Sequence, residues 1–276
     1  MPQGNNKPDL HELYEAAVQN VDADLDFAER IFRNHRHRSA KTLREDFCGT
    51  AKLACEWVKR HSKNQAWGID IHAPTLAWGE QHHVARLEKK QSKQIHLLRG
   101  DVLEVDTPPV DLLFALNFSF CIFKTRKLLL RYFKQAHQNL APDGLFVMDI
   151  YGGTESMMAK SDDTRLVDGF ISHTGQKIPD FEYTWEQARF NPINHHTLCY
   201  IHFKVPGEGE IPKAFSYDWR LWTLPELQEL LLEAGFSNAE VYLHGFNKEG
   251  ESDEIFRRRK TYENAQAWIA YVVGVR

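Results

Sequence analysis

The sequence predicts an open α/β fold, in which helices alternate with the strands of a mostly parallel sheet, interrupted by an antiparallel insertion. First, Leu43 to Asp70 reads as strand, glycine turn, helix and strand, and it ends on an acid. Second, the apolar run Val110 to Leu116 is typical of a strand covered on both faces. Third, aromatic-rich segments of period two occur between Thr154 and Trp222, and helix signals return after them.

Composition limits the class of protein. A chain of 276 residues can bury one substantial core, so one α/β domain with an insertion is expected rather than two independent domains. The formal net charge of −4 gives no overall attraction to nucleic acid or to an anionic membrane. No run is apolar enough to span a membrane, and the polar first ten residues predict no signal peptide. The four cysteines form no CxxC pair, which favours a reducing, cytoplasmic setting and disfavours a zinc site.

The elements follow from local patterns. Two N-terminal helices are expected over Leu10–Asn20 and Asp22–Arg38, and the basic run Arg33–Arg38 is read as a solvated helix end or, alternatively, as a nucleic-acid patch. In the first strand–turn–helix unit, Gly49 lies in the turn and Thr50 is the expected helix cap. Later elements are expected as follows: helices at Pro74–Lys90 and Thr125–Leu140, strands at Ala66–Ile69, Ile95–Leu98, Val110–Leu116 and Leu145–Ile150, and a turn at Pro142–Gly144.

The C-terminal part returns to the sheet. Thr223 and Glu226 form a capping box, and Gly235 ends the helix that they begin. Strands at Ala239–Leu243 and Ala267–Val273 then read as a hairpin with a long polar loop, Asn247 to Tyr262, which gives about seven strands in the sheet.

The carboxyl ends of the strands indicate the ligand, because open α/β sheets bind ligands at that edge. A dinucleotide fingerprint needs three glycines, whereas only Gly49 is present here. Glu45 and Asp46 before the turn would repel a diphosphate and suit a ligand that is cationic and carries no phosphate. S-adenosylmethionine (SAM) has a sulfonium and an ammonium group, and its ribose hydroxyls could donate to Asp70.

At the segment REDFCGTA, residues 44–51, the chain resembles the class I methyltransferases, whose first motif reads acid-x-G-x-G-x-G. Phe47 and Ala51 replace the first and third glycines. More narrowly, nearly the whole chain resembles a group of mostly uncharacterised bacterial methyltransferases. The resemblance implies a Rossmann-like sheet of seven strands with helices on both faces. It also implies N-terminal helices in 1–40 that cover the cofactor, a methyltransferase core in 41–153 and 223–276, and an antiparallel acceptor lid in 154–222.

The same resemblance implies a SAM-dependent methyltransferase, and the aromatic residues of the insertion favour a small-molecule acceptor, methylated at nitrogen or oxygen, over a polymer. Asp101 and the backbone amide of Val102 are expected to read the adenine, with a turn-capping aspartate as the alternative. Phe118 is expected to line the sulfonium or else to be a core residue. The residues expected at the cofactor are Tyr14, Glu45, Phe47, Gly49, Thr50, Asp70, Ile71, Asp101, Val102, Asn117 and Phe118.

The acceptor is expected to meet polar-tipped aromatic residues and one cation, because aromatic faces stabilise a sulfonium or a methylated ammonium. The candidates are Tyr151, Tyr217, Arg220 and Trp222, and for each of them core packing is the alternative. No general base, metal ligand or oligomeric state is indicated. Two other functions stay open. An RNA or protein methyltransferase would use Arg33–Arg38 and Arg257–Lys260, and a non-catalytic cofactor-binding module would result if Phe47 filled the methionine end of the pocket.

Overall fold

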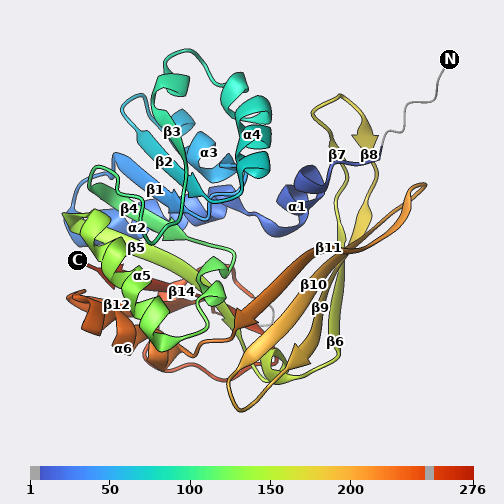
Figure 1. The fold of residues 1–276 in the computed structure, drawn as a ribbon. Helices are drawn as coiled ribbons and strands as arrows, with labels where there is room; N and C mark the ends of the chain where they lie inside the picture. The colour runs from blue at the N-terminus through green and yellow to red at the C-terminus, as the bar shows by residue number, and fades with distance from the viewer. Residues whose placement is uncertain (1–6, 246–251) are drawn as a thin grey trace. The chain divides into compact units, whose positions relative to one another are not determined.

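The computed structural model describes residues 7–245 and 252–276, and it divides into two compact units (Figure 1). The core unit comprises Asn20–Gly153 and Trp222–Arg276. The insert unit comprises the chain up to Gln19 together with Thr154–Leu221. Each unit has its own apolar core, so each is described separately below.

The core unit is built on an eight-stranded sheet in the order β13-β12-β14-β5-β4-β1-β2-β3. The strands from β3 to β5 pair in parallel, whereas β14, β12 and β13 are antiparallel to their neighbours. The predicted α/β fold is therefore confirmed, with a two-residue strand added from the C-terminal polar loop. The strands are β1 Thr42–Asp46, β2 Gln65–Asp70, β3 Ile95–Arg99, β4 Val110–Ala115, β5 Leu140–Gly152, β12 Asn238–Leu243, β13 Arg257–Arg258 and β14 Trp268–Val275.

Helices connect these strands, and every residue of β4 is buried, as predicted for a strand covered on both faces. Short 3₁₀ turns lie at Val84–Arg86, Gln91–Lys93 and Ser119–Ile122. The helices of this unit are α2 Val21–Arg36, α3 Lys52–Arg60, α4 Ala73–His82, α5 Arg126–Asn139 and α6 Leu224–Ala234.

Helix α6 forms as its local signals predict. The Thr223 hydroxyl accepts the backbone N–H of Glu226, and the Glu226 carboxylate accepts the backbone N–H of Thr223. Gly235 ends the helix in a left-handed conformation with φ of 110°.

Two predicted boundaries are wrong. The helix expected over Pro74–Lys90 ends at His82, where a 3₁₀ turn follows. The turn expected at Pro142–Gly144 lies inside β5, beside a register shift in the pairing with β4. A Cβ atom on Gly144 would lie 2.9 Å from the Val110 carbonyl oxygen, so this glycine permits close approach of the two strands rather than a reversal.

The insert unit contains a four-stranded antiparallel sheet in the order β11-β10-β9-β6 and a short hairpin, β7–β8 (Figure 1). The period-two segments correctly predicted β9 and β10, whereas β6 to β8 are short or largely exposed and gave no clear pattern. A 3₁₀ turn, Glu155–Met157, precedes the sheet. The strands are β6 Ser161–Val167, β7 Phe170–Ile171, β8 Lys177–Ile178, β9 Phe181–Phe190, β10 His196–Val205 and β11 Gly209–Arg220.

Helix α1, Leu10–Val18, belongs to the insert unit, although it directly precedes α2 in the chain. Its buried residues Leu13 and Ala17 pack in one cluster with Phe181, Ile201 and Phe203 of the sheet. The two N-terminal helices, expected to act together, thus have apolar faces that pack in different cores. Their role in covering a cofactor stays a prediction.

Candidate cofactor site

The turn after β1 keeps the backbone shape of a glycine-rich loop with only one glycine. Phe47, Gly49 and Ala51 have φ values of 58°, 54° and 57°, all left-handed. Left-handed backbone costs a residue with a side chain about 1–2 kcal/mol. Such conformations persist where the surrounding structure imposes them, and they concentrate at functional sites. Phe47 and Ala51 therefore differ from the motif in residue type, but they keep the left-handed backbone that its glycines allow.

Asp70 fastens this turn to the end of β2. Its two carboxylate oxygens accept the backbone N–H groups of Gly49, at 2.9 Å, and of His72, at 2.8 Å. The Cys48 N–H also donates to the Ile69 carbonyl, at 3.0 Å. A carboxylate oxygen has more than one lone pair, so Asp70 has capacity to accept from ribose hydroxyls as well, and that contact remains a prediction. Ile71, the next residue, is 68% exposed.

The N-terminus of α3 is capped from a distance, and the prediction that Thr50 caps it is wrong. The N-cap residue is Ala51, which has no capping side chain. The Glu45 carboxylate accepts the N–H of Ala54 instead, at 3.1 Å. Glu45 thus satisfies one helix donor and places a buried carboxyl group at the positive end of a helix.

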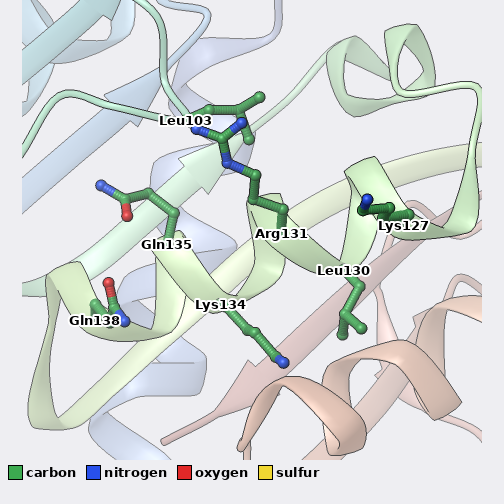
Figure 2. A pocket seen from close by; sticks show the side chains of 7 residues that line it. All are labelled: Leu103, Lys127, Leu130, Arg131, Lys134, Gln135 and Gln138. Carbon is green, nitrogen blue, oxygen red and sulfur yellow. The ribbon is translucent and has the colours of Figure 1, made fainter.

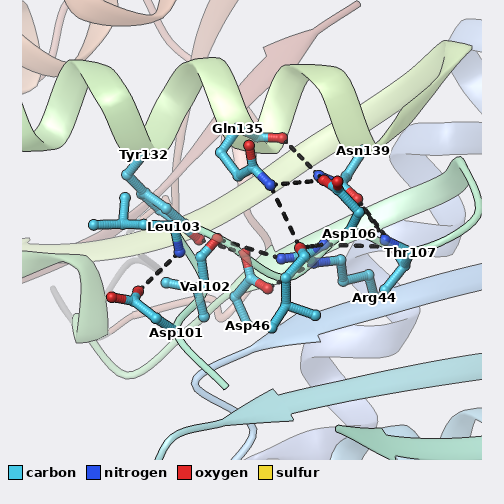
Figure 3. A network of polar contacts seen from close by, with 11 residues as sticks. Arg44, Asp46, Asp101, Val102, Leu103, Asp106, Thr107, Tyr132, Gln135 and Asn139 are labelled. Atoms are coloured by element: carbon cyan, nitrogen blue, oxygen red, sulfur yellow. Dashed lines mark hydrogen bonds and ion pairs between the residues drawn. The ribbon is translucent and has the colours of Figure 1, made fainter. Parts of the chain in front are cut away.

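Asp46 lies in a different environment from its neighbour Glu45. The fully buried Arg44 side chain donates to Asp46 at 2.7 Å and to the Val105 carbonyl at 2.8 Å (Figure 3). The Tyr132 hydroxyl donates to the second Asp46 oxygen at 3.0 Å. Arg44 therefore neutralises Asp46 inside the fold. Of the two acids expected to repel phosphate, Glu45 is the one without a cation among the described residues.

The same network fixes the loop after β3, which carries two predicted adenine contacts. Asp101 accepts the N–H of Leu103 at 2.9 Å, so the alternative interpretation, a turn-capping aspartate, describes its observed contact. Val102 is only 4% exposed, and its carbonyl accepts from Arg44 at 3.5 Å. Figure 3 shows this loop lying between the end of β1 and α5. The contact of Asp101 and Val102 with the adenine remains a prediction.

The end of β4 is a second left-handed turn. Asn117 and Phe118 have φ values of 55° and 58°. Asp149 on β5 holds this turn by accepting the Phe118 N–H at 2.9 Å. The Phe118 and Tyr151 rings lie 4.9 Å apart between centroids. Sequence analysis missed Asp149, although a single acid inside the apolar strand LFVMDI was the available signal.

Three carboxyl groups of the core unit hold their protons unusually tightly. Burial raises the pKa of Glu45 to about 8 and that of Asp149 to about 7. Burial also raises the pKa of Asp24, on α2, to about 6, against the lowering effect of a hydrogen bond from the Tyr271 hydroxyl. Asp24 was also missed by sequence analysis.

The predicted acceptor residues fall in both units. Tyr217 and Arg220 belong to the insert unit, whereas Tyr151 and Trp222 belong to the core unit. Trp222 is 2% exposed, which matches the alternative of core packing.

Tyr14, expected at the cofactor, lies among the aromatic residues of the insert unit. Its ring is 4.9 Å from that of Phe215, and its hydroxyl is hydrogen-bonded to Tyr217. The Tyr217 ring stacks on Trp185 at 5.7 Å and lies 4.3 Å from Trp219. Tyr14 and Tyr217 thus form part of one partly buried aromatic cluster, and their contacts with a ligand remain a prediction.

The basic segments are largely bonded within the core unit. Arg38 forms ion pairs with Asp111 at 2.6 Å and with Asp143 at 2.7 Å, while Arg33, His37 and Arg38 stay exposed, as expected for a solvated helix end. Arg258 of β13 pairs with Glu240 at 2.8 Å. These internal bonds leave less charge available for a nucleic acid.

A surface hollow of about 370 Å³ lies along α5 and reaches Leu103, which follows the predicted adenine contact Val102 (Figure 2). Its lining is basic and polar, and it includes none of the residues predicted for cofactor or acceptor. The lining residues are Leu103, Lys127, Leu130, Arg131, Lys134, Gln135 and Gln138. Within residues 7–245 and 252–276, no group of three or more metal-ligating side chains is present. Nor does that part of the chain contain a helix long and apolar enough to cross a membrane.

No family model matches the chain, and no curated protein matches it significantly. Solved structures do match over almost the full length. The protein DesVI from Streptomyces venezuelae is 18% identical with a TM-score of 0.68, covering 98% of this chain and 99% of that one. An amino pentose methyltransferase from Micromonospora echinaspora, solved with SAM, is 17% identical with a TM-score of 0.64, covering 97% and 98%. A SAM-dependent methyltransferase from Clostridium acetobutylicum is 16% identical with a TM-score of 0.63, covering 96% and 97%. At these identities the likeness shows the fold.

Proposed function

From the class I methyltransferase fold of this chain, we propose that it is a SAM-dependent methyltransferase that acts on a small-molecule acceptor. When bound, SAM would supply an activated methyl group, which the acceptor takes by in-line displacement. For such a reaction the protein mainly has to orient the two reactants and exclude water.

One observation carries the cofactor assignment. The left-handed turn at Phe47, Gly49 and Ala51 lies between two carboxyl groups, Glu45 at its start and Asp70 across from Gly49. The turn resembles a cofactor loop in its backbone, but the Asp70 carboxylate beside it disfavours a diphosphate, and the buried Glu45 would ionise beside a cation rather than beside a phosphate. A cationic nucleoside without phosphate fits this charge arrangement. SAM would therefore be held by the backbone of the turn, with Asp70 at its ribose and Glu45 near its cationic end.

Ligand-induced stabilisation tests the assignment directly. The melting temperature should rise with SAM or S-adenosylhomocysteine (SAH) and stay unchanged with NAD or NADP, because a ligand stabilises the folded state that binds it. A rise with either dinucleotide and none with SAM or SAH would overturn the proposal in favour of an oxidoreductase.

For the acceptor we propose a small amine or hydroxyl compound. Two similar structures are described as an amino pentose methyltransferase and a sugar N-methyltransferase. In this chain, the aromatic cluster of Tyr14, Trp185, Tyr217 and Trp219 offers ring faces that attract a methylated ammonium. The internal pairing of Arg38 and the other basic residues favours such an acceptor over RNA.

Kinetics of a variant in the insert unit test the acceptor assignment. Tyr217→Phe removes one hydroxyl and keeps the ring, so it should raise KM for the acceptor and leave SAH affinity within about twofold, roughly 0.4 kcal/mol. Trp222→Ala removes a buried side chain of the core unit. The SAH affinity of this variant reports whether cofactor binding depends on that side chain. A parallel loss of SAH affinity in a folded Tyr217→Phe protein would show that the insert unit belongs to the cofactor site.

A further inference from the structure

Three carboxyl groups of the core unit come from three different elements: Asp24 from α2, Glu45 from the carboxyl end of β1 and Asp149 from β5. Glu45 begins one of the two left-handed turns that carry predicted cofactor residues, and Asp149 holds the other. Tyr271, which donates to Asp24, is the cross-strand neighbour of Asp149. Their hydrogen bonds come from uncharged donors: the Tyr271 hydroxyl donates to Asp24, the Ala54 N–H to Glu45, and backbone N–H groups that include those of Phe118 and Asn117 to Asp149. Among the residues that the structure describes, no lysine, arginine or histidine pairs with any of the three.

The three groups belong to one electrostatic cluster. The charges of Asp24, Asp46 and Asp70 each disfavour ionisation of Glu45, and the charge of Asp24 also disfavours ionisation of Asp149. Among the described residues, the other ionisable groups that interact with them supply no unpaired positive charge. Arg44 is paired with Asp46, and the pKa values of the Cys48 thiol beside Glu45 and of the Tyr271 hydroxyl beside Asp24 are raised.

Burial and mutual repulsion therefore keep part of the cluster protonated near neutral pH. The pKa values are about 6 for Asp24, about 8 for Glu45 and about 7 for Asp149. A cation placed beside these groups would favour their ionised forms and lower their pKa values. A neutral ligand in the same place would not.

We propose that Asp24, Glu45 and Asp149 couple SAM binding to proton release, and that this coupling favours SAM over SAH. The inference rests on the proposed function, because it takes SAM as the ligand of the predicted cofactor site. SAM has a net charge of +1, from its sulfonium, ammonium and carboxylate groups, whereas SAH lacks the sulfonium charge. Asp24 and Asp149 thus become specificity-determining residues at the proposed site.

The proton balance gives a quantitative consequence. If SAM displaces about one more proton than SAH, the preference for SAM over SAH rises about tenfold per pH unit while the cluster titrates. In the transfer step, the sulfur–methyl bond breaks, the acceptor forms the new bond and the sulfonium charge disappears. The cluster then takes back the proton that it lost. Inhibition by the product SAH should consequently be strongest at low pH.

Calorimetry of the full chain measures the coupling without any acceptor. SAM and SAH are titrated at pH 7 in buffers of different ionisation enthalpy, and the slope of observed enthalpy against buffer enthalpy gives the protons released. The expected result is about one extra proton for SAM. Sinefungin, which has an amine in place of the methyl sulfonium, should behave like SAM.

Variants identify the groups responsible. Glu45→Gln and Asp149→Asn keep an oxygen to accept the Ala54 and Phe118 N–H groups but cannot titrate. Each should reduce the extra proton release and flatten the pH dependence of the SAM to SAH affinity ratio. Glu104→Gln is the matched control, because that side chain is 71% exposed and pairs only loosely with Arg131, at 3.7 Å. It should leave both quantities unchanged.

The outcomes separate the two proposals. Absence of binding by both SAM and SAH overturns the proposed function. Binding of both with equal proton release by the unmodified chain leaves that function intact and overturns the coupling. Extra release that survives in both variants also overturns the assignment to this cluster. If a variant does not fold, the calorimetry of the unmodified chain still decides whether coupling exists.

Discussion

Asp70 has a structural role, because both of its carboxylate oxygens accept backbone N–H groups of the adjoining turns. A contact with the ribose would use the same two oxygens. We expect Asp70→Ala to weaken SAH binding roughly tenfold to a hundredfold, since a charge-assisted hydrogen bond contributes ~1.5–3 kcal/mol. Titration calorimetry measures the change. Asp70→Asn, which keeps one acceptor oxygen, serves as the milder comparison. Unchanged affinity in a folded Asp70→Ala protein would contradict a role at the ribose.

Arg44 is the residue on which the buried network depends. Arg44→Met should lower the free energy of unfolding by about 3–5 kcal/mol, because it leaves the Asp46 carboxylate buried without its cation. Urea denaturation measures the loss. The double variant Arg44→Met/Asp46→Asn should recover part of it, since the unpaired charge is then removed. A single variant as stable as the unmodified protein would show that the ion pair contributes nothing.

At the residue scale, the sequence predicted the positions at strand ends but not the buried pairing. Gly49 and Asp70 could be placed because a strand, a turn and a short helix separate them in a recognisable order. The role of Arg44 could not, because its network includes Tyr132, which is 86 residues beyond Asp46 in the chain. Asp149 and Asp24 were missed for the same reason, since their partners come from other elements.

The helices show the same distinction between local and distant signals. The capping box of α6 is contained within four residues, so it could be read from the sequence and is confirmed. The cap of α3 comes from Glu45 on the preceding strand, through a left-handed turn, and the nearby Thr50 was predicted instead. Helix ends are therefore predictable where the capping group is adjacent in the chain.

Helix α1 offers a prediction at the scale of an element. Leu13 is fully buried in the core of the insert unit, so Leu13→Ala should destabilise that unit by about 2–5 kcal/mol. Hydrogen exchange should then accelerate in β9 and β10 more than in β1 and β4. Leu25→Ala, at an equally buried position of α2, is the matched control and should produce the opposite pattern. Equal acceleration of both sheets in the Leu13 variant would contradict the division into two cores.

At the scale of the whole molecule, the raised carboxyl pKa values predict an unusual pH dependence of stability. Glu45, Asp149 and Asp24 bind protons more tightly in the folded state than their ordinary pKa values near 4 allow. The folded state then binds more protons than the unfolded state between about pH 4 and 8, so the free energy of unfolding falls as pH rises through that range.

Thermal denaturation of the ligand-free protein from pH 5 to pH 8 measures this dependence. The melting temperature should decline with pH, and Glu45→Gln should flatten the decline at its upper end, where Glu45 titrates. A melting temperature that rises steadily with pH would show that these groups are ionised in the folded protein.

The placement of α1 has a consequence for how the protein is made. The helix leaves the ribosome well before the strands on which it packs, because its contacts lie far along the chain, such as the Glu12 carboxylate with the His173 N–H, 161 residues later. At a synthesis rate of about 5–20 residues per second, the apolar face of α1 waits on the order of ten seconds for its sheet. During that interval the nascent helix is a natural client for a chaperone. The insert unit can complete its core only after translation has passed through most of the molecule.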